Sequence, residues 1–581
     1  MTRRSIAGCF ALTLIAVVGF GATAGAAVVS PRPPVLLITI DHVGFADLFG
    51  GDRRALALAS MGGAALVSQR LPLATTLESV FGEGLPFVEL DDGSLAAADG
   101  RVDPAAVRDV FDRLDARLAE LGSSNVVVML VSRSPSVEGA RAGDELGVIE
   151  MATGTGTQIS DALSSGAGGV SAPALTSDST RRDGVVTTSD IAVTVANLTN
   201  TPVPSSVTGA VIHPTDAPAP FALYQRYRDQ RRLTVPIGVA AGFYAAIAGI
   251  FALVIGLKGT AVSERLRRMA AWSAISIVPL GLALLEVGRL PRLTYGVVTP
   301  FLVGSTVLGA SATVLLARRR GVIPAIVWLG AAVLAVLTVE AATGWPGAVT
   351  PLLGGSQLDG GRFFGVPNAF IGLVLGSAVF VALGLRRVWA GAALLLAAGL
   401  VVGSPWFGSD LGGAIMLCAA AGLWWGTRSH ANLARTVLVT GAAALLGAVL
   451  VVLTQRYLAS SPTHITHFAE GSGHTGGIVG TAAERLRIGV KLLVRHPFAL
   501  LPVMGVPVAL WAVLRPGPNL RPLLQEEPAF RAALITILWG SVIAYAVNDT
   551  GASALGLGFA SAVAAMLFVP LAGQRESMVP A

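Results

Sequence analysis

From residue 233 to residue 573 the chain repeats one pattern, an apolar run of roughly membrane-spanning length followed by a short polar turn. A helix of about 20 apolar residues crosses the roughly 30 Å of a bilayer's hydrocarbon. Across the whole chain 53% of residues are hydrophobic and 13% are charged, whereas a soluble protein carries about a quarter charged residues. This composition excludes a disordered chain, a disulfide scaffold and a soluble enzyme. We predict an α-helical polytopic membrane protein.

The predicted membrane region, residues 233–573, divides into eleven apolar segments. Each has about the length that a membrane span needs, although some are a little short. The segments are 235–257, 270–289, 294–317, 322–341, 366–385, 388–404, 411–426, 433–454, 498–514, 530–547 and 551–572.

Arginines in the turns between these segments predict the topology. Cytoplasmic loops of membrane proteins carry an excess of Lys and Arg. Five arginine-bearing turns fall on one side of the membrane if residues 31–232 lie outside, and that arrangement makes the tail 574–581 cytoplasmic. The arginines are Arg265, Arg267 and Arg268; Arg318, Arg319 and Arg320; Arg386 and Arg387; Arg428 and Arg435; Arg515 and Arg521.

The region before the apolar segments has a different charge balance. Residues 31–232 hold 24 acidic residues and 16 arginines with no lysine, which gives a net charge of −8. The net charge of the whole chain is +6, so the residues outside this region carry +14. The basic excess is explained by the membrane topology, and we expect no nucleic-acid partner. Residues 1–30 combine Arg3 and Arg4 with an apolar core and small residues, which is typical of a secretory signal peptide or a signal anchor. Residues 31–232 would then be exported.

Alternating strand and helix patterns in residues 31–232 predict an α/β domain. Residues 35–40 and 125–131 are short apolar runs of the kind that form buried strands. Residues 105–121 place Val107, Val110, Phe111, Leu114 and Leu118 on one helical face. Residues 151–182 are rich in Gly, Ser, Thr and Ala, and we expect a long loop there.

Several polar residues fall on the predicted outer side of the membrane region. Arg362, Arg485 and Arg487 lie there against the usual charge bias. An arginine fork suits phosphate oxygens, so these arginines favour an anionic, lipid-linked substrate. The alternative is an interfacial arginine that reaches towards lipid headgroups. Asn368 and Asp410 lie at the outer ends of spans, where polar side chains are costly and often functional.

The largest outer loop, residues 455–497, contains four of the seven histidines. His464, His467 and His474 could act as a general base near neutral pH. Their spacing does not match a zinc site, and we expect no metal and no other cofactor. The remaining alternative is a solvated loop followed by an interfacial amphipathic helix.

Three segments between residues 361 and 505 resemble the O-antigen ligase and polymerase family. Residues 361–368 read G-R-F-F-G-V-P-N, similar to that family's R-x-x-G-x-x-x-N-P-N type of segment, with Val366 where the family often has Asn. Residues 403–413 and 484–505 resemble its next span boundary and its arginine-bearing helix. The resemblance implies glycan transfer from an undecaprenyl diphosphate carrier. It also implies that Arg362, Arg485 and Arg487 bind the diphosphate and that an outer-loop histidine activates the acceptor hydroxyl.

Two segments of residues 31–232 resemble the alkaline phosphatase superfamily. Residues 35–41, V-L-L-I-T-I-D, are similar to its first strand and metal-binding Asp, and residues 184–198 to its late T-D-I-x-P-T segment. The resemblance implies two metal ions, but Asp41 and Asp190 alone cannot hold them. Arg133 also stands where an Asp-His-Gly motif would begin. We therefore expect a pseudo-phosphatase that binds a partner or a substrate.

Together these features predict cell-envelope glycan assembly at the outer face of the cytoplasmic membrane. The reaction would be glycosyl transfer from a polyprenyl diphosphate, with Arg362, Asn368, Asp410, Arg485 and Arg487 binding substrate and His464, His467 or His474 catalytic. The expected partners are the lipid bilayer and a lipid-linked glycan or another anionic lipid. Three alternatives stay open: a transporter or flippase of lipid-linked intermediates, a non-catalytic membrane protein whose exported domain binds an envelope protein, and an active metal-dependent phosphotransferase.

Overall fold

The computed structural model separates Met1–Pro33 from one compact unit, Pro34–Ala581. The predicted signal segment and the tail 574–581 lie outside the described residues. The structure describes residues 34–41, 53–68, 73–81, 88–94, 104–132, 146–165, 172–204, 207, 209–218, 220–258, 262–353, 356, 358, 363–458, 487, 500–517, 520–548 and 551–573.

Residues 35–218 contain a mixed sheet of eight strands, in the order β3-β1-β4-β5-β2-β6-β8 with β7 beside β2. The pairs of β1 with β3 and with β4 are parallel, and the pairs of β5 with β4 and with β2 are antiparallel. The strands are β1 Val35–Asp41, β2 Gly62–Ser68, β3 Val88–Ser94, β4 Asn125–Ser132, β5 Leu146–Thr155, β6 Pro173–Ser177, β7 Val185–Thr187 and β8 Ile212–Pro218.

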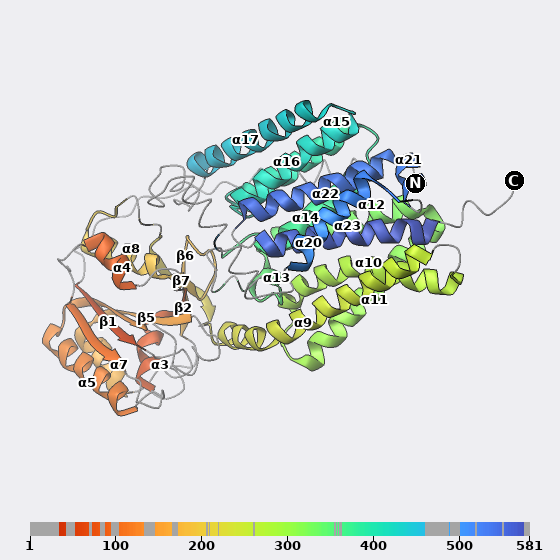
Figure 1. The fold of residues 1–581 in the computed structure, drawn as a ribbon. Coiled ribbons are helices and arrows are strands. Elements are labelled where there is room, and N and C mark those ends of the chain that lie inside the picture. The colour runs from red at the N-terminus through yellow and green to blue at the C-terminus, as the bar shows by residue number, and fades with distance from the viewer. Residues whose placement is uncertain are drawn as a thin grey trace. The chain divides into compact units, whose positions relative to one another are not determined.

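Helices cover both faces of this sheet (Figure 1). Side chains alternate along a strand, so Leu36 and Ile38 of β1 lie in one apolar core while Val35 and Leu37 lie in the other. The first core is completed by α3 Arg53–Ser60, α5 Pro104–Leu121 and α7 Gly156–Ser165. The second is completed by α4 Leu73–Phe81 and α8 Thr188–Thr199. The predicted α/β layers are present.

The elements predicted at 35–40, 105–121 and 125–131 are confirmed, and the five predicted apolar residues of α5 are all buried. The long loop predicted at 151–182 is wrong, because this stretch holds the end of β5, α7 and β6. Its small residues permit close packing. A Cβ on Gly156 would lie 2.4 Å from the Leu118 carbonyl oxygen of α5, and Ile159 and Leu163 supply the buried face of α7.

A helix overlaps each of the eleven predicted membrane segments, and seven of these helices are long and apolar enough to cross a membrane. This makes the chain a multi-pass membrane protein by length and composition. The number of eleven spans stays a prediction. The predicted domain boundary at residue 232 falls inside α9, which continues without a break from Phe221 to Lys258. The helices are α9 Phe221–Lys258, α10 Glu264–Glu286, α11 Tyr295–Arg320, α12 Val322–Ala342, α14 Ile371–Leu383, α15 Val388–Gly403, α16 Leu411–Arg428, α17 Leu433–Leu458, α20 Leu500–Leu514, α22 Pro528–Val547 and α23 Gly551–Gly573.

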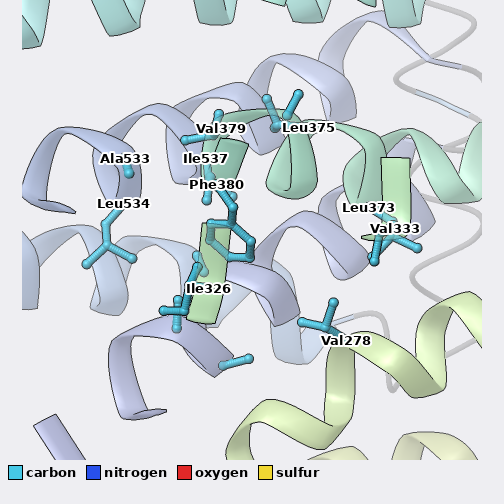
Figure 2. Packing of buried hydrophobic residues seen from close by; sticks show 14 of the residues in the cluster. Val278, Ile326, Val333, Leu373, Leu375, Val379, Phe380, Ala533, Leu534 and Ile537 are labelled. Atoms are coloured by element: carbon cyan, nitrogen blue, oxygen red, sulfur yellow. The ribbon is translucent and has the colours of Figure 1, made fainter. Parts of the chain in front are cut away.

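Helix α14 forms the centre of this bundle and packs against α12, α22 and α23. Nearly all of its side chains are buried. Phe380 lies among Ile326 of α12 and Ile537 of α22 (Figure 2). Helices α9, α11 and α17 instead expose many large apolar side chains, among them Ile247, Leu308 and Leu438. Such all-round apolar helices fit a lipid surrounding.

The two ends of the bundle differ in chemistry. One end, which we call the arginine end, carries the turns with Arg265–Arg268, Arg318–Arg320 and Arg386–Arg387. The opposite end, which we call the polar end, carries the turns 287–294, 343–370 and 404–410 and the last residues of α17 and α22.

Candidate functional site at the polar end of the bundle

Asp410 begins helix α16 at the polar end. Its Oδ1 accepts the backbone N–H of Gly413 at 2.9 Å, which caps the helix. The side chain is 1% exposed. A Cβ on Gly413 would lie 2.8 Å from Asp410 Oδ2 and 2.9 Å from Ile371 Cδ1. The glycine therefore allows the carboxylate to lie close to the first residue of α14.

Ser409 and Gln455 form a second buried polar pair beside Asp410. Ser409 has a φ of 47°, a left-handed conformation that is rare outside glycine. Gln455 Nε2 donates to Ser409 Oγ at 3.0 Å and to the Gly403 carbonyl at 2.9 Å. These bonds connect the last turn of α17 to the turn between α15 and α16. Gln455 Oε1 has no hydrogen-bond partner among the described residues.

Asn548 ends helix α22 and lies against the first turn of α16. A Cβ on Gly412 would lie 2.5 Å from Asn548 Oδ1. The residue is 4% exposed, and its Nδ2 donor has no partner in the described part of the chain. A buried donor without a partner costs free energy, roughly 1–3 kcal/mol in proteins. Such a group is therefore available to a ligand.

Residues 363–370 bring a third segment to the polar end. Gly365 has a φ of +89°, and a Cβ there would lie 2.3 Å from Gly408 Cα. Only glycine combines this conformation with so close an approach to the turn 404–410. Asn368 follows in a short 3-10 turn that opens α14, and its buried Oδ1 has no partner among the residues described.

Two arginines of the β6–β7 turn contact the same segments. Arg181 donates to the Pro405 carbonyl at 2.6 Å, and its guanidinium lies 4.4 Å from the centre of the Phe364 ring. Arg182 donates to the Phe363 carbonyl. Burial lowers the pKa of Arg182 to about 10, with Glu340 opposing the shift, so the side chain stays protonated at neutral pH. Both cations lie beside the residues that directly follow Arg362.

An ion-pair cluster joins three helix ends nearby. Arg289 bonds Glu340 of α12 and also Glu286 of α10 at 2.9 Å. Glu340 is fully buried and accepts the backbone N–H of Gly347 at 2.9 Å. A Cβ on Gly347 would lie 3.0 Å from that carboxylate. Because both Glu340 oxygens have protein partners, this cluster stabilises the turns and is less available to a ligand than Asn548.

The polar end therefore combines cations with unpaired amides. Asn548 offers a donor, while Asn368 and Gln455 offer acceptors, and the arginines add positive charge. This set suits a ligand with hydroxyl groups and an anionic group. No three His, Cys, Asp or Glu side chains of the described segments lie close enough together to hold a metal ion.

The described residues contain three of the predicted site residues. Asp410 and Asn368 lie at the polar end, and Arg487 is exposed. Arg362, Arg485, His464, His467 and His474 lie outside the described residues, so their predicted convergence with Asp410 stays a prediction.

Asp190, which carries part of the phosphatase resemblance, has a local structural role. It accepts the backbone N–H groups of Thr187 and Ala210, both at 2.8 Å, and forms a capping box at the start of α8. Ser177 and Ser179 also donate to it. Burial raises the pKa of Asp190, and these four hydrogen bonds oppose the shift.

Sequence reasoning missed Gln455, Arg181 and Arg182. Gln455 had a usable signal, because it is a polar residue within the last turn of an apolar helix. Arg181 and Arg182 had none, because their partners Pro405 and Phe363 lie far away in the sequence.

Comparison with known proteins does not identify the chain. No family model matches it, and no curated protein or solved structure shows a match.

Proposed function

We propose that this protein transfers a glycan from a polyprenyl diphosphate carrier to an acceptor hydroxyl at the outer face of the cytoplasmic membrane. In this proposal the polar end faces outwards and forms the substrate site. Asn368 and Asp410 lie at that end, Arg362 directly precedes the segment 363–370, and the predicted histidines follow α17 in sequence.

One observation supports the proposal above the others. Buried amides with unpaired atoms from three helix ends gather at the same end of an apolar bundle as the cations Arg181 and Arg182. Unpaired polar groups are costly within a membrane protein and mark functional sites. A glycan presents many hydroxyl groups to such amides, and a diphosphate presents its charge to arginines.

The proposed roles follow from the chemistry of the reaction. The glycosyl–oxygen bond to the diphosphate breaks, and the leaving diphosphate gains negative charge that Arg362, Arg485 and Arg487 would stabilise. The acceptor hydroxyl forms the new glycosidic bond and loses its proton to His464, His467 or His474. Asn548 and Gln455 would hold sugar hydroxyls in place, and Arg181 and Arg182 would position the segment that follows Arg362.

The test is binding of undecaprenyl diphosphate to the purified full chain in detergent. We expect Arg362→Ala and Arg485→Ala each to weaken binding at least tenfold. Arg386→Ala, an arginine of the opposite end, is the matched control and should bind as the wild type does. Binding that is indifferent to both outer arginines would overturn the proposal.

The histidines distinguish a transferase from a flippase. A transferase in which one of them is the base should lose glycan transfer in the triple variant His464→Ala/His467→Ala/His474→Ala while it still binds the carrier. Unchanged transfer would remove these histidines from the reaction. Carrier translocation across vesicles without any glycan transfer would favour the flippase instead.

A further inference from the structure

Helix α9 changes its chemistry along one exposed face. Arg228 and Arg232 lie on that face in the first part of the helix and are both exposed. Val235, Val239 and Ile247 follow on the same side and are 69%, 41% and 64% exposed. Side chains three or four residues apart are neighbours on a helix surface. The helix therefore presents two cations directly before a long apolar surface.

The opposite face of α9 is fixed against the polar end of the bundle. Gln230 is buried, and its Nε2 donates to the Pro351 carbonyl at 2.8 Å. Leu233 is buried in one apolar cluster with Leu293 of the turn 287–294. These contacts determine which side of α9 faces outwards, and they place its two exposed arginines at the level of the polar end.

The exposed face carries a positive charge. Arg228 lies 5.9 Å from the centre of the Tyr224 ring, a contact that positions the guanidinium and leaves its charge in place. Arg292, which directly precedes the buried Leu293, is a third exposed arginine at this level. Asp229 is the single acidic residue of α9. Arg228, Arg232 and Arg292 together exceed it by two positive charges.

The acidic residues behind this face do not cancel that charge. Glu340 is fully buried, and Glu286 is largely buried. Both bond Arg289, and Glu340 also interacts electrostatically with Arg182. Two carboxylates therefore already have two cations of their own.

The apolar part of the exposed face has the length of a lipid chain. A helix rises about 1.5 Å per residue, so Val235 and Ile247 lie about 18 Å apart along the axis. One leaflet supplies half of the roughly 30 Å of hydrocarbon. An arginine at the edge of this layer lays its stem along apolar surface and keeps its charge at the headgroups. Basic clusters in this position attract anionic lipids.

We propose that Arg228, Arg232 and Arg292 bind the phosphate of an anionic phospholipid in the leaflet at the polar end, with one acyl chain along the exposed face of α9. The site does not depend on the proposed glycan transfer, because none of these arginines has a role in that reaction. Helix α9 runs without a break from the sheet region into the bundle. A lipid bound here holds the helix where it leaves the membrane.

The experiment places the purified full chain in phosphatidylcholine vesicles that contain a little phosphatidylglycerol with a photoactivatable diazirine in one acyl chain. After illumination, mass spectrometry of the peptides measures the labelling of residues 233–258. The test variant is Arg228→Gln/Arg232→Gln. The matched control, Arg319→Gln/Arg320→Gln, removes the same charge from exposed arginines of the arginine end. We expect labelling of this segment to fall at least about fivefold in the test variant and to change less than about twofold in the control.

A neutral probe distinguishes a bound lipid from general contact with the bilayer. Phosphatidylcholine with the same diazirine should label residues 233–258 several-fold less than the anionic probe, and equally in the wild type and the test variant. Equal labelling of the wild type by the two probes would overturn the proposal. An equal loss in the test and control variants would show an effect of overall charge and would overturn it too.

Two further arms complete the test. Arg232→Gln changes one exposed side chain and should keep the fold, so it replaces the double variant if that variant does not fold, and several-fold weaker labelling is expected. Inorganic phosphate at the concentration of the probe lipid should leave the labelling unchanged. Loss of labelling under that condition would contradict the proposal, because the site would then be one for free phosphate.

Discussion

Asp190 of the sheet region and Asn548 of the helical region are both buried polar side chains at helix ends, but their surroundings differ. Asp190 accepts hydrogen bonds from two backbone N–H groups and two serines. The Nδ2 group of Asn548 has no partner among the described residues. A fully bonded buried group holds a fold together. An incompletely bonded one costs stability and is retained where something else, such as a ligand, completes it.

The largest effect should come from Asp190→Ala. The change removes a helix cap and leaves four donors without their acceptor in a buried site, which costs about 2–4 kcal/mol from the known sizes of these two effects. We expect the thermal unfolding midpoint of the full chain in detergent to fall by several degrees. Asp161→Ala, at an exposed position of α7, is the control and should leave the midpoint unchanged. Equal midpoints for the two variants would contradict the structural role of Asp190.

A comparable effect is expected from Gly365→Ala, which tests the segment that follows Arg362. The new Cβ meets Gly408 Cα at 2.3 Å and the residue keeps a φ of +89°, so strain and overpacking together should cost about 2–5 kcal/mol. Gly344 has a similar φ of +79° with nothing within 4 Å of its Cβ position. Gly344→Ala therefore measures the backbone strain alone. Carrier binding should weaken in Gly365→Ala and not in Gly344→Ala, and equal binding by the two would separate this segment from the site.

The sheet region and the helical region differ in how much of their structure could be predicted from the sequence. Apolar length predicted the seven long helices of the bundle, because a span of about 20 residues can be recognised without knowledge of its neighbours. The α7 helix was not predicted, because its small residues reveal their role only where Gly156 meets Leu118. Asp410 and Asn368 were identified because polar residues stand out in apolar segments. Arg181 and Arg182 contact carbonyls more than 180 residues away in sequence, and no local pattern encodes such a contact.

Asn548→Leu should separate stability from function. Leucine replaces an amide whose donor is unpaired, so the folded state loses little, and the free energy of unfolding should change by less than about 1 kcal/mol. Glycan transfer should fall about tenfold, because a hydrogen bond to the substrate is lost. The measurement pairs the unfolding midpoint with the transfer rate. A fall of several degrees with unchanged transfer would make Asn548 a structural residue like Asp190.

The smallest effect is the pH dependence that Asp190 contributes to stability. Its folded pKa lies above the value of an unfolded aspartate, about 3.9. Between these two pKa values the folded chain holds a proton that the unfolded chain has released, so stability falls as pH rises through that window. Below the unfolded pKa both states are protonated and the penalty is absent. As pH rises through this window, the unfolding midpoint of the wild type should therefore fall relative to that of Asp190→Asn. Outside the window the difference between the two midpoints should stay constant. A difference that grows as pH falls below the unfolded pKa would mean that the hydrogen bonds outweigh burial and lower the pKa of Asp190.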